Sequence, residues 1–463
     1  MNLLVKDIIK TTNGKLIIGN ENIECKNFCI DTRKIQENDV YVGIKGEKFD
    51  GNTLWKEALE NGASVDIIAN IDFSNENLEK FKNKAIILVD DTKKALQQIA
   101  KKKREMYGKD FPIIAITGSV GKTSTKDMVA NVLNQKYKTL KTEGNFNNDV
   151  GLPLTLLRLE NHEAAVVEMG MNHFGEIRLL TNIANPTISV ITNIGTSHIG
   201  NLGSRENILK AKLEILEGMD KPTLVLNEDN DLLQKWREEN SENIITYTYG
   251  IENNALAQAK DIKLNEENSE FTCILGENKF NVKVPVAGIH FVYNALCSAV
   301  IGNLLGLTID EIKRGIETFE LTKKRMEIIN LKDGITVIND AYNASLESMR
   351  ASIQNLAGYT RKKIAILGDM FELGEFSENL HREVGKEIVK NNIDTLICSG
   401  ENAKFIVEEA KKQGMNKENI HYFENKEEIL NFLNSLHLSN TVILWKASNG
   451  MKFFELVEKY IKQ

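Results

Sequence analysis

The stretch of sequence that decides the fold is PIIAITGSVGKTS, residues Pro112 to Ser124. Its first six residues form a short apolar run, which is typical of a buried strand. A glycine-containing turn follows, and then Met128, Val129, Val132 and Leu133 fall on one face of a helix. Glycines let backbone N–H groups turn inward around phosphate oxygens, and the start of a helix adds positive potential. The stretch therefore predicts a strand, a phosphate-binding loop and a helix.

Two residues of this loop have side chains suited to a nucleotide. Lys122 would hold the β- and γ-phosphates, and the hydroxyl of Thr123 would ligate Mg²⁺. The general phosphate-loop pattern also asks for a glycine five residues before Gly121, where this chain has Ile116. An ordinary glycine turn therefore remains the alternative interpretation.

The pattern on either side of this stretch predicts an α/β protein. Ala164 to Val167 and Ile188 to Ile194 are two more buried strands, so the middle of the chain should form a parallel sheet with helices on both sides. The pattern restarts beyond residue 320, where none of the five prolines lies, and predicts a second doubly wound sheet. Its strands are expected at Ile364 to Leu367, Thr395 to Cys398, His421 to Phe423 and Thr441 to Leu444.

The first hundred residues mix short strands with helices. Strands are expected at Asp39 to Ile44 and Ala85 to Val89, and a helix near Leu54 to Gly62. A helix that ends in the basic run Lys101 to Arg104, followed by Gly108, marks a boundary. We therefore expect three domains, at residues 1–107, 108–320 and 321–463.

Length and composition agree with this division. The chain has 463 residues, which is about three domains at roughly 150 residues each. Hydrophobic residues make up 42% and charged residues 27%, a globular composition that excludes wholesale disorder. The net charge of −7 argues against a protein that coats nucleic acid or anionic membrane. No apolar stretch is long enough for a transmembrane helix, and the N-terminus does not resemble a secretory signal.

The cysteines point to the cytoplasm. Five are scattered along the chain, and Cys25 and Cys29 have no second pair with which to complete a zinc site. We expect free thiols in a monomeric cytoplasmic protein.

Glu168 and His198 each follow a predicted strand. A carboxylate at the carboxyl end of a strand beside a phosphate loop is suitably placed for Mg²⁺, although Glu168 could equally be an ordinary strand-end residue. His198 closes the segment Thr192 to His198, and a lone histidine is more often structural.

Lys212 lies on an apolar helical stripe with Ile208 and Leu216. An inward lysine is costly unless it is paired or chemically changed. Two interpretations of Lys212 are open: a lysine delivered to an active site, or a lysine whose stem is buried and whose head reaches water.

Three polar clusters remain. Gly144 to Asp149 holds three amides and a carboxylate, which suits a peptide-like ligand, although a polar turn would look the same. Asn339 to Asn343 follows an expected strand. Asp31 to Arg33 and Lys45 to Glu47 supply cations that could bind a diphosphate, or that could be ordinary surface charges.

Together these segments resemble the Mur ligases of peptidoglycan synthesis, and within that family the members that add D-alanyl-D-alanine. TGSVGKTS is shared by Mur ligases and folylpolyglutamate synthases. GNFNNDVGLPLTLLRL (144–159), EMGMNHFGEI (168–177), NDAYNAS (339–345) and LGDMFELGEFSENLH (367–381) resemble the D-Ala-D-Ala-adding members specifically. The similarity runs from Asp31 almost to the C-terminus.

The resemblance implies three domains and a reaction. The domains would bind a UDP precursor, bind ATP on a parallel sheet, and form a Rossmann-like C-terminal unit. ATP would phosphorylate the carboxylate of UDP-N-acetylmuramoyl-tripeptide, and the amine of D-Ala-D-Ala would attack the resulting acyl phosphate.

The resemblance also implies roles for particular residues. Gly118, Ser119, Val120, Gly121, Lys122, Thr123 and Ser124 would bind the ATP phosphates. Thr123, Glu168, His198 and Lys212 would serve two Mg²⁺ ions, with Lys212 carrying a carbamate derived from CO₂. Asn294, Arg325 and Asp340 match nucleotide-contacting positions; Thr32, Arg33 and Lys45 match the uridine-nucleotide side, and Asn147 and Asn148 the dipeptide side.

Two departures from the family pattern are visible. Phe291, not asparagine, follows His290, and Asn449 stands where an arginine is common, so Asn449 is assigned no contact with the dipeptide.

Three other kinds of protein share parts of this sequence pattern. The sister ligase that adds a diamino acid to UDP-MurNAc-dipeptide commonly carries an Asp-x-Pro-Arg segment in its C-terminal domain, where this chain has no proline. Folylpolyglutamate synthase usually has its ATP loop near the start of the chain. A GTPase switch would need Asn-Lys-x-Asp, but the chain offers only 416–419 and 425–428, and neither has the aspartate.

Overall fold

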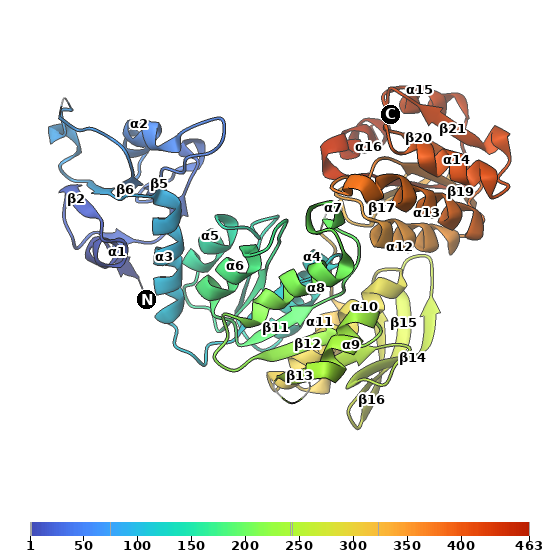
Figure 1. Cartoon of the computed structure of the whole chain (residues 1–463), viewed down its shortest axis with the longest axis horizontal. Coiled ribbons are helices and arrows are strands. Elements are labelled where there is room, and N and C mark those ends of the chain that lie inside the picture. The colour runs from blue at the N-terminus through green and yellow to red at the C-terminus, as the bar shows by residue number, and fades with distance from the viewer. Residues whose placement is uncertain (1, 75, 241, 243, 323, 463) are drawn as a thin grey trace. The chain divides into compact units, whose positions relative to one another are not determined.

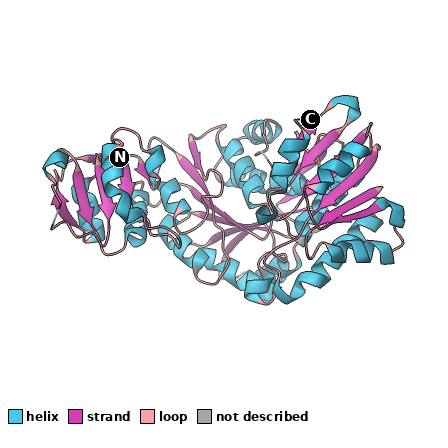
Figure 2. Cartoon of the chain, turned by 90° about the horizontal axis from the view of Figure 1, so that it is seen from above, coloured by secondary structure: helices cyan, strands magenta, loops and turns pink. Residues whose placement is uncertain are grey.

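The structure, a computed structural model, describes residues 2–74, 76–240, 242, 244–322 and 324–462. These residues fall into two compact units. Unit 1 comprises Met1–Thr117, Tyr137–Ser189 and Leu213–Thr223, and unit 2 comprises Gly118–Lys136, Val190–Lys212 and Leu224–Gln463. Helices and strands make up both units, as Figure 2 shows.

Unit 1 begins with a five-stranded sheet in the order β2-β7-β6-β5-β4. β2 runs antiparallel to β7, and the remaining pairs are parallel. One apolar cluster of this part contains Tyr41, Trp55 and Phe81. The strands are Lys15–Ile18 (β2), Phe28–Cys29 (β4), Val40–Val42 (β5), Val65–Ile68 (β6) and Ala85–Leu88 (β7); β1 (Leu3–Leu4) pairs with β3 (Glu24–Cys25); the helices are α1 (Val5–Thr12), α2 (Trp55–Glu60) and α3 (Thr92–Glu105).

Three further strands of unit 1 are parallel, in the order β8-β10-β9. They are β8 (Ile113–Thr117), β9 (Thr139–Lys141) and β10 (Ala164–Glu168), accompanied by α5 (Gly151–Leu157) and α6 (Glu176–Ala184). β8 and β10 are buried along their whole length, which explains their continuous apolar sequences. In this register Glu168 lies opposite Ile116, one residue before the end of β8.

Unit 2 contains the helix that follows the phosphate loop and a set of strands in the order β16-β15-β14-β13-β12. β13 and β14 are parallel, but β14, β15 and β16 are antiparallel. The apolar runs of the sequence predict only parallel strands in the middle of the chain, and the antiparallel strands β14 to β16 add to them. β15 and β16 are joined by a two-residue turn in which Gly276 has a φ of 59°, a conformation that glycine adopts readily.

The elements of this part of the chain have the following bounds. The strands are β11 (Ile188–Ile191), β12 (Thr223–Asn227), β13 (Ile245–Gly250), β14 (Ala257–Leu264), β15 (Ser269–Leu275) and β16 (Asn278–Val284); the helices are α4 (Lys122–Leu133), α7 (Ile199–Leu202), α8 (Arg205–Leu213), α9 (Asp231–Asn240), α10 (Ile289–Leu304) and α11 (Ile309–Glu317).

The C-terminal part of unit 2 is a six-stranded sheet in the order β17-β18-β22-β19-β20-β21, orange and red in Figure 1. Only β17, at one edge, is antiparallel to its neighbour. The strands are β17 (Glu327–Asn330), β18 (Thr336–Asn339), β19 (Lys362–Leu367), β20 (Thr395–Ser399), β21 (Ile420–Phe423) and β22 (Thr441–Lys446); the helices are α12 (Leu346–Ala357), α13 (Ser377–Lys390), α14 (Lys404–Lys412), α15 (Glu428–Ser435) and α16 (Phe453–Tyr460).

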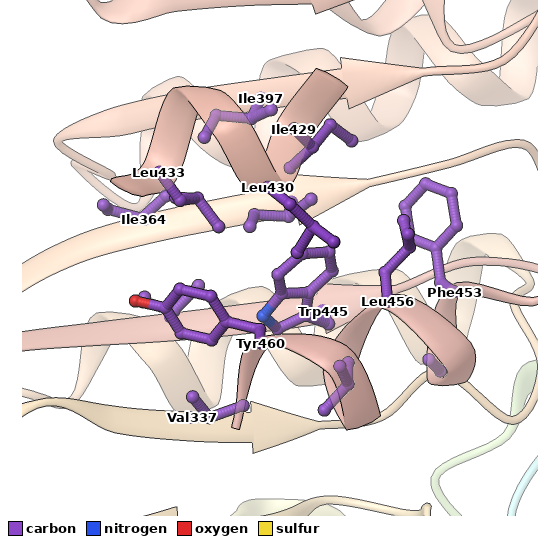
Figure 3. Close-up of a cluster of buried hydrophobic side chains, with 14 of the residues drawn as sticks. Val337, Ile364, Ile397, Ile429, Leu430, Leu433, Trp445, Phe453, Leu456 and Tyr460 are labelled. Atoms are coloured by element: carbon purple, nitrogen blue, oxygen red, sulfur yellow. The ribbon is translucent and has the colours of Figure 1, made fainter. Parts of the chain in front are cut away.

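One face of this sheet is covered by α15 and α16. Trp445 on β22 lies at the centre of the contact, with Leu430 of α15 and Leu456 of α16 packed around it, as Figure 3 shows. Trp445 is fully buried and meets the ring of Phe453 edge-on at a centroid distance of 6.3 Å. The predicted Rossmann-like strands of the C-terminal part therefore form, each within two residues of its expected bounds.

Within the described residues, no helix combines the length and apolarity needed to cross a membrane.

Candidate active site

The loop after β8 has a shape that only glycine permits. Gly118 has a φ of 151°, and a Cβ at this position would lie 1.8 Å from Thr192 Oγ1. Gly121 has a φ of 84° and forms the N-cap of α4. The loop forms although Ile116 stands where the general motif has glycine, because Ile116 belongs to β8 and the turn starts after it.

The segment after β11 holds this loop in place. Ser119 N donates to Asn193 O at 3.0 Å. The side chain of Asn193 accepts from Val120 N and donates to Val120 O, both at 3.0 Å, and Thr192 Oγ1 donates to the same carbonyl at 2.7 Å. The backbone of the loop is therefore fixed before any ligand arrives.

Lys122 and Thr123 begin α4, directly after the loop. Lys122 Nζ donates to Gly118 O at 2.8 Å, so its ammonium group lies over the loop. Thr123 is buried at the positive end of the helix. Thr125, one turn into the helix, donates to Asn294 Oδ1 at 2.9 Å.

Asn294 is a predicted nucleotide contact that unit 2 places beside the loop. It lies on α10, and its Oδ1 would be 3.9 Å from a Cβ on Gly121. Its Nδ2 is buried and has no hydrogen-bond partner among the residues that the structure describes. A buried donor without a partner is costly and is available to a ligand.

Lys212 lies near the end of α8 and is 1% exposed. Burial lowers the pKa of its amine well below the usual value, and the charge of Lys122 acts in the same direction. The prediction of an inward lysine is thus confirmed. The neutral amine that burial favours is the nucleophilic form of lysine.

His198 has a φ of 64° and precedes α7. Its Nδ1 lies 2.5 Å from Glu372 Oε2, which belongs to the segment after β19. Beside this pair the two backbones approach closely: Gly200 N donates to Glu372 O at 3.1 Å, and a Cβ on Gly200 would lie 2.6 Å from Gly374 N. His198 is therefore held by a contact within unit 2.

Asp340 and Arg325 belong to a separate cluster of unit 2. Asp340 Oδ1 accepts from Met326 N at 3.1 Å, and its Oδ2 accepts from Ser352 Oγ at 2.6 Å and from the buried ammonium of Lys446. Arg325 stacks on the ring of Tyr342, with Cζ of the guanidinium 4.2 Å from the ring centroid. Both carboxylate oxygens of Asp340 already have protein partners.

Unit 1 carries the remaining residues predicted around ATP and the dipeptide. Glu168 is buried at the end of β10, and its Oε1 accepts from Asn147 Nδ2 at 2.8 Å. Asn148 Oδ1 accepts from Gly151 N, the first residue of α5, at 2.8 Å. The predicted amide cluster thus positions one carboxylate and one helix.

The residues predicted for the uridine side lie in the first sheet region of unit 1. Thr32 is buried, and its carbonyl accepts from Asn61 Nδ2 at 3.1 Å. Arg33 is exposed and forms a two-pronged pair with Asp31, with both N–O distances 2.8 Å. Lys45 is exposed at a bridge to Asp50. Among the described residues, no hydrogen bond or ion pair joins Lys45 to Thr32 or Arg33.

Four residues at the site were not singled out from the sequence: Asn193, Glu347, Glu372 and Lys446. Asn193 and Glu372 lie in the segments Thr192 to His198 and 367–381 discussed above, and Lys446 is the last residue of β22. Glu347 and Glu372 contact residues far away in the sequence, so no local pattern identifies them. No three His, Cys, Asp or Glu side chains come together as a metal cage in the described parts of the chain.

Comparison with known proteins shows the family to which the chain belongs. Residues 24–104 match the model described as Mur ligase family, catalytic domain; residues 116–302 match the Mur ligase middle domain; and residues 324–449 match Mur ligase, glutamate ligase domain. The chain is 40% identical to the UDP-N-acetylmuramoyl-tripeptide–D-alanyl-D-alanine ligase of Bacillus subtilis, over 99% of this chain and 98% of the relative. The chain belongs to the Mur ligase family.

Solved structures of Mur ligases agree. MurF from Acinetobacter baumannii superposes with a TM-score of 0.90 at 29% identity, covering 100% of this chain and 99% of that one. MurF from Thermotoga maritima, solved in complex with ADP, has a TM-score of 0.81 at 28% identity, covering 94% and 97%. The expected fold class, α/β in three domains, and the resemblance to Mur ligases are both confirmed, and membership supports ATP as a substrate.

Proposed function

We propose that this chain is an ATP-dependent ligase that joins D-alanyl-D-alanine to UDP-N-acetylmuramoyl-tripeptide in the synthesis of the peptidoglycan precursor. The observation that carries the proposal is the pre-formed phosphate loop with Lys122, in a chain 40% identical along almost its whole length to a ligase of that name. We assign residues 1–107 to the UDP precursor, 108–320 to ATP and 321–463 to a ligase domain.

The chemistry requires ATP because an amine cannot displace the poor leaving group of a bare carboxylate. Transfer of the γ-phosphoryl group to the tripeptide carboxylate gives an acyl phosphate. Attack by the dipeptide amine gives a tetrahedral intermediate, which collapses to the amide and phosphate. The first step brings two anions together, so cations must offset their repulsion.

Residues Gly118 to Ser124 would hold the ATP phosphates through the backbone N–H groups at the start of α4. Lys122 would exchange its bond to Gly118 O for phosphate oxygens. Asn294, with its free buried amide N–H, supports the nucleotide from α10. We also assign Arg325 and Asp340 to the nucleotide; Asp340 would have to share an oxygen that now accepts from Ser352 or Lys446.

The residues proposed for two Mg²⁺ ions are Thr123, Glu168, His198 and Lys212. The oxygen donors fit: Glu168 is a buried carboxylate with one oxygen bonded to Asn147, and Thr123 is a buried hydroxyl. When bound, Mg²⁺ would neutralise charge on the transferring phosphoryl group. His198 would orient its ring through Glu372 and offer Nε2.

A carbamate on Lys212 fits the surroundings of this side chain. Lys122 and Lys212 are close enough for each charge to disfavour the other, and Lys212 is the fully buried one. Reaction of the neutral amine with CO₂ would form an N–C bond and release one proton, leaving a carbamate anion. This anion would be attracted to the charge of Lys122, which a protonated Lys212 would repel, and it would provide a carboxylate-like ligand.

The substrate residues are proposed from their positions in unit 1. Thr32, Arg33 and Lys45 would contact the uridine nucleotide, and the exposed guanidinium of Arg33 suits a diphosphate. Asn147 and Asn148 would lie near the dipeptide. The enzyme is proposed to act as a cytoplasmic monomer, since the described cysteines are free thiols.

One assay tests this function. Phosphate release is measured with each UDP-MurNAc-peptide, with and without D-Ala-D-Ala. Release that requires both the tripeptide substrate and D-Ala-D-Ala supports the proposal. Release driven by a diamino acid and the dipeptide substrate would assign the chain to the sister ligase instead.

A further inference from the structure

The phosphate loop is held by the segment that follows β11, and this segment is itself held from outside. Gly195 N donates to Ser119 Oγ at 2.9 Å, and Asn193 makes two side-chain bonds to Val120. Ser119 and Val120 are the two loop residues between its glycines. A shift of the segment would therefore shift the backbone that faces the phosphates.

A carboxylate from the first turn of α12, that of Glu347, accepts hydrogen bonds from the segment after β11. Glu347 Oε1 accepts from Thr196 N at 2.8 Å, and its Oε2 accepts from Thr196 Oγ1 at 3.2 Å. A Cβ on Gly195 would lie 2.5 Å from Glu347 Cδ, so glycine is needed for this approach. Thr196 is buried, and hydrogen bonds from buried groups to a carboxylate are stronger than neutral ones.

A cation, Arg205, also contacts this segment, at a backbone carbonyl group. Arg205 Nη2 donates to Ile194 O at 2.8 Å and pairs with Asp231 at 2.6 Å. The segment is therefore fixed by a cation on one carbonyl and by Glu347 on the N–H two residues later.

We propose that Glu347 is a positioning residue for the nucleotide: by holding Gly195 and Thr196, it sets the phosphate loop at Ser119 and Val120. The ATP site then reaches its full affinity only when α12 is docked on this segment. Glu347 acts through the segment and does not itself touch a phosphate. The inference rests on the proposed function, because it concerns the ATP site of that ligase.

A general docking role would give a different result, and the chain offers a control for it. Glu266, in the turn between β14 and β15, also joins two parts of unit 2: its Oε2 lies 3.5 Å from Arg361 Nη2, and its carbonyl accepts from Tyr359 Oη at 2.9 Å. It is a carboxylate at another contact with the same C-terminal sheet. Glu266→Ala removes the side-chain contact with Arg361 but leaves the Glu347–Thr196 contact in place, so it should not disturb the phosphate loop.

The test uses the full chain with Glu347→Ala, Glu347→Gln and Glu266→Ala. Calorimetry with MgATP measures affinity, and steady-state kinetics give KM for each substrate. Glu347→Ala should weaken MgATP binding about tenfold, because a hydrogen bond to a charged group is lost. KM for the UDP substrate should stay within about twofold, since the N-terminal residues are untouched. Glu347→Gln, which keeps an acceptor for Thr196 N, should lose only about threefold.

Wild-type affinity in Glu347→Ala, or an equal loss in Glu266→Ala, would overturn the inference. If Glu347→Ala does not fold, Glu347→Gln and Thr196→Val each remove part of the contact, and unchanged MgATP affinity in both is equally decisive. The proposed function fails separately: wild-type protein that binds MgATP but releases no phosphate in the presence of both UDP-MurNAc-tripeptide and D-Ala-D-Ala refutes the assigned reaction and leaves the Glu347 measurement intact.

Discussion

Asp66 lies within β6 with both carboxylate oxygens buried, and neither has a hydrogen-bond partner among the described residues. Its cross-strand neighbours are Tyr41 on β5 and Ile86 on β7, which belong to an apolar cluster. Burial raises the pKa of Asp66 well above its usual value, and the charge of Lys84 offsets only part of this effect. Asp66→Val should therefore stabilise the N-terminal sheet.

The magnitude follows from the missing partners. Leaving a buried polar group without a hydrogen bond costs about 1–3 kcal/mol, and valine at this position recovers that cost while adding apolar contact. The gain should depend on pH. A carboxyl whose pKa is raised in the folded state holds a proton that the unfolded chain has released, so stability falls as pH rises above about 4. The slope for one such group is at most about 1.4 kcal/mol per pH unit.

Hydrogen exchange followed by mass spectrometry, on peptides covering Val65–Ile68, measures the local opening free energy. Between about pH 5 and pH 8 the wild-type value should fall, after correction for intrinsic exchange, while that of Asp66→Val stays level. Asp66→Asn should remove the pH dependence but keep most of the cost of an unpartnered group. Exposed Asp110 provides the control, because Asp110→Val should change neither. A constant difference between Asp66→Val and wild type across pH would refute the assignment of a buried, protonated carboxyl.

Three further predictions concern the ATP site. Lys122→Ala should lower turnover by at least about a hundredfold with an unchanged melting temperature, since the phosphate charge loses its cation; phosphate release by a folded variant at near wild-type rate would contradict this. Lys212→Ala should also abolish turnover, with partial rescue by short-chain carboxylates if wild-type Lys212 carries a carbamate. ¹³C NMR of the wild type under ¹³CO₂ should show the carbamate signal. Undiminished turnover of the variant would falsify the proposed role of Lys212. Gly118→Ala should abolish MgATP binding in calorimetry, because its Cβ would lie 1.8 Å from Thr192 Oγ1. Gly276→Ala, at positive φ but with open space around it, should cost only about 1–2 kcal/mol of stability and leave binding intact.

The sequence predicts an element best where a short stretch of residues alone determines whether it forms a helix or a strand. The buried parallel strands have continuous apolar runs, so β10 and β19 are found within two residues of their expected bounds. The antiparallel strands β14 to β16 were missed because polar residues interrupt their apolar ones, so none of them has the continuous apolar run of a strand that is buried on both faces. Asp66 in a fully buried strand could not have been expected, since nothing local offsets the cost of burying it.

The candidate site was predictable where residues follow a strand and not where distant segments meet. Lys212 was inferred from the apolar stripe on its own helix, and Glu168 from its position at the end of β10. The contacts of His198 with Glu372 and of Thr196 with Glu347 depend on how α7 and α12 pack in unit 2, which no local periodicity encodes. The resemblance to Mur ligases implied that Asp340 contacts a nucleotide, but its bonds to Lys446 and Ser352 required the three-dimensional arrangement.

The close approach of Gly200 and Gly374 allows a purely steric substitution at this contact. Because the two main chains touch where neither residue has a side chain, a single methyl group at position 200 would force them apart by steric pressure alone. Such a substitution would alter no charge and remove no donor or acceptor. It would distinguish the effect of separating these two backbone segments from the effect of deleting a polar group between them.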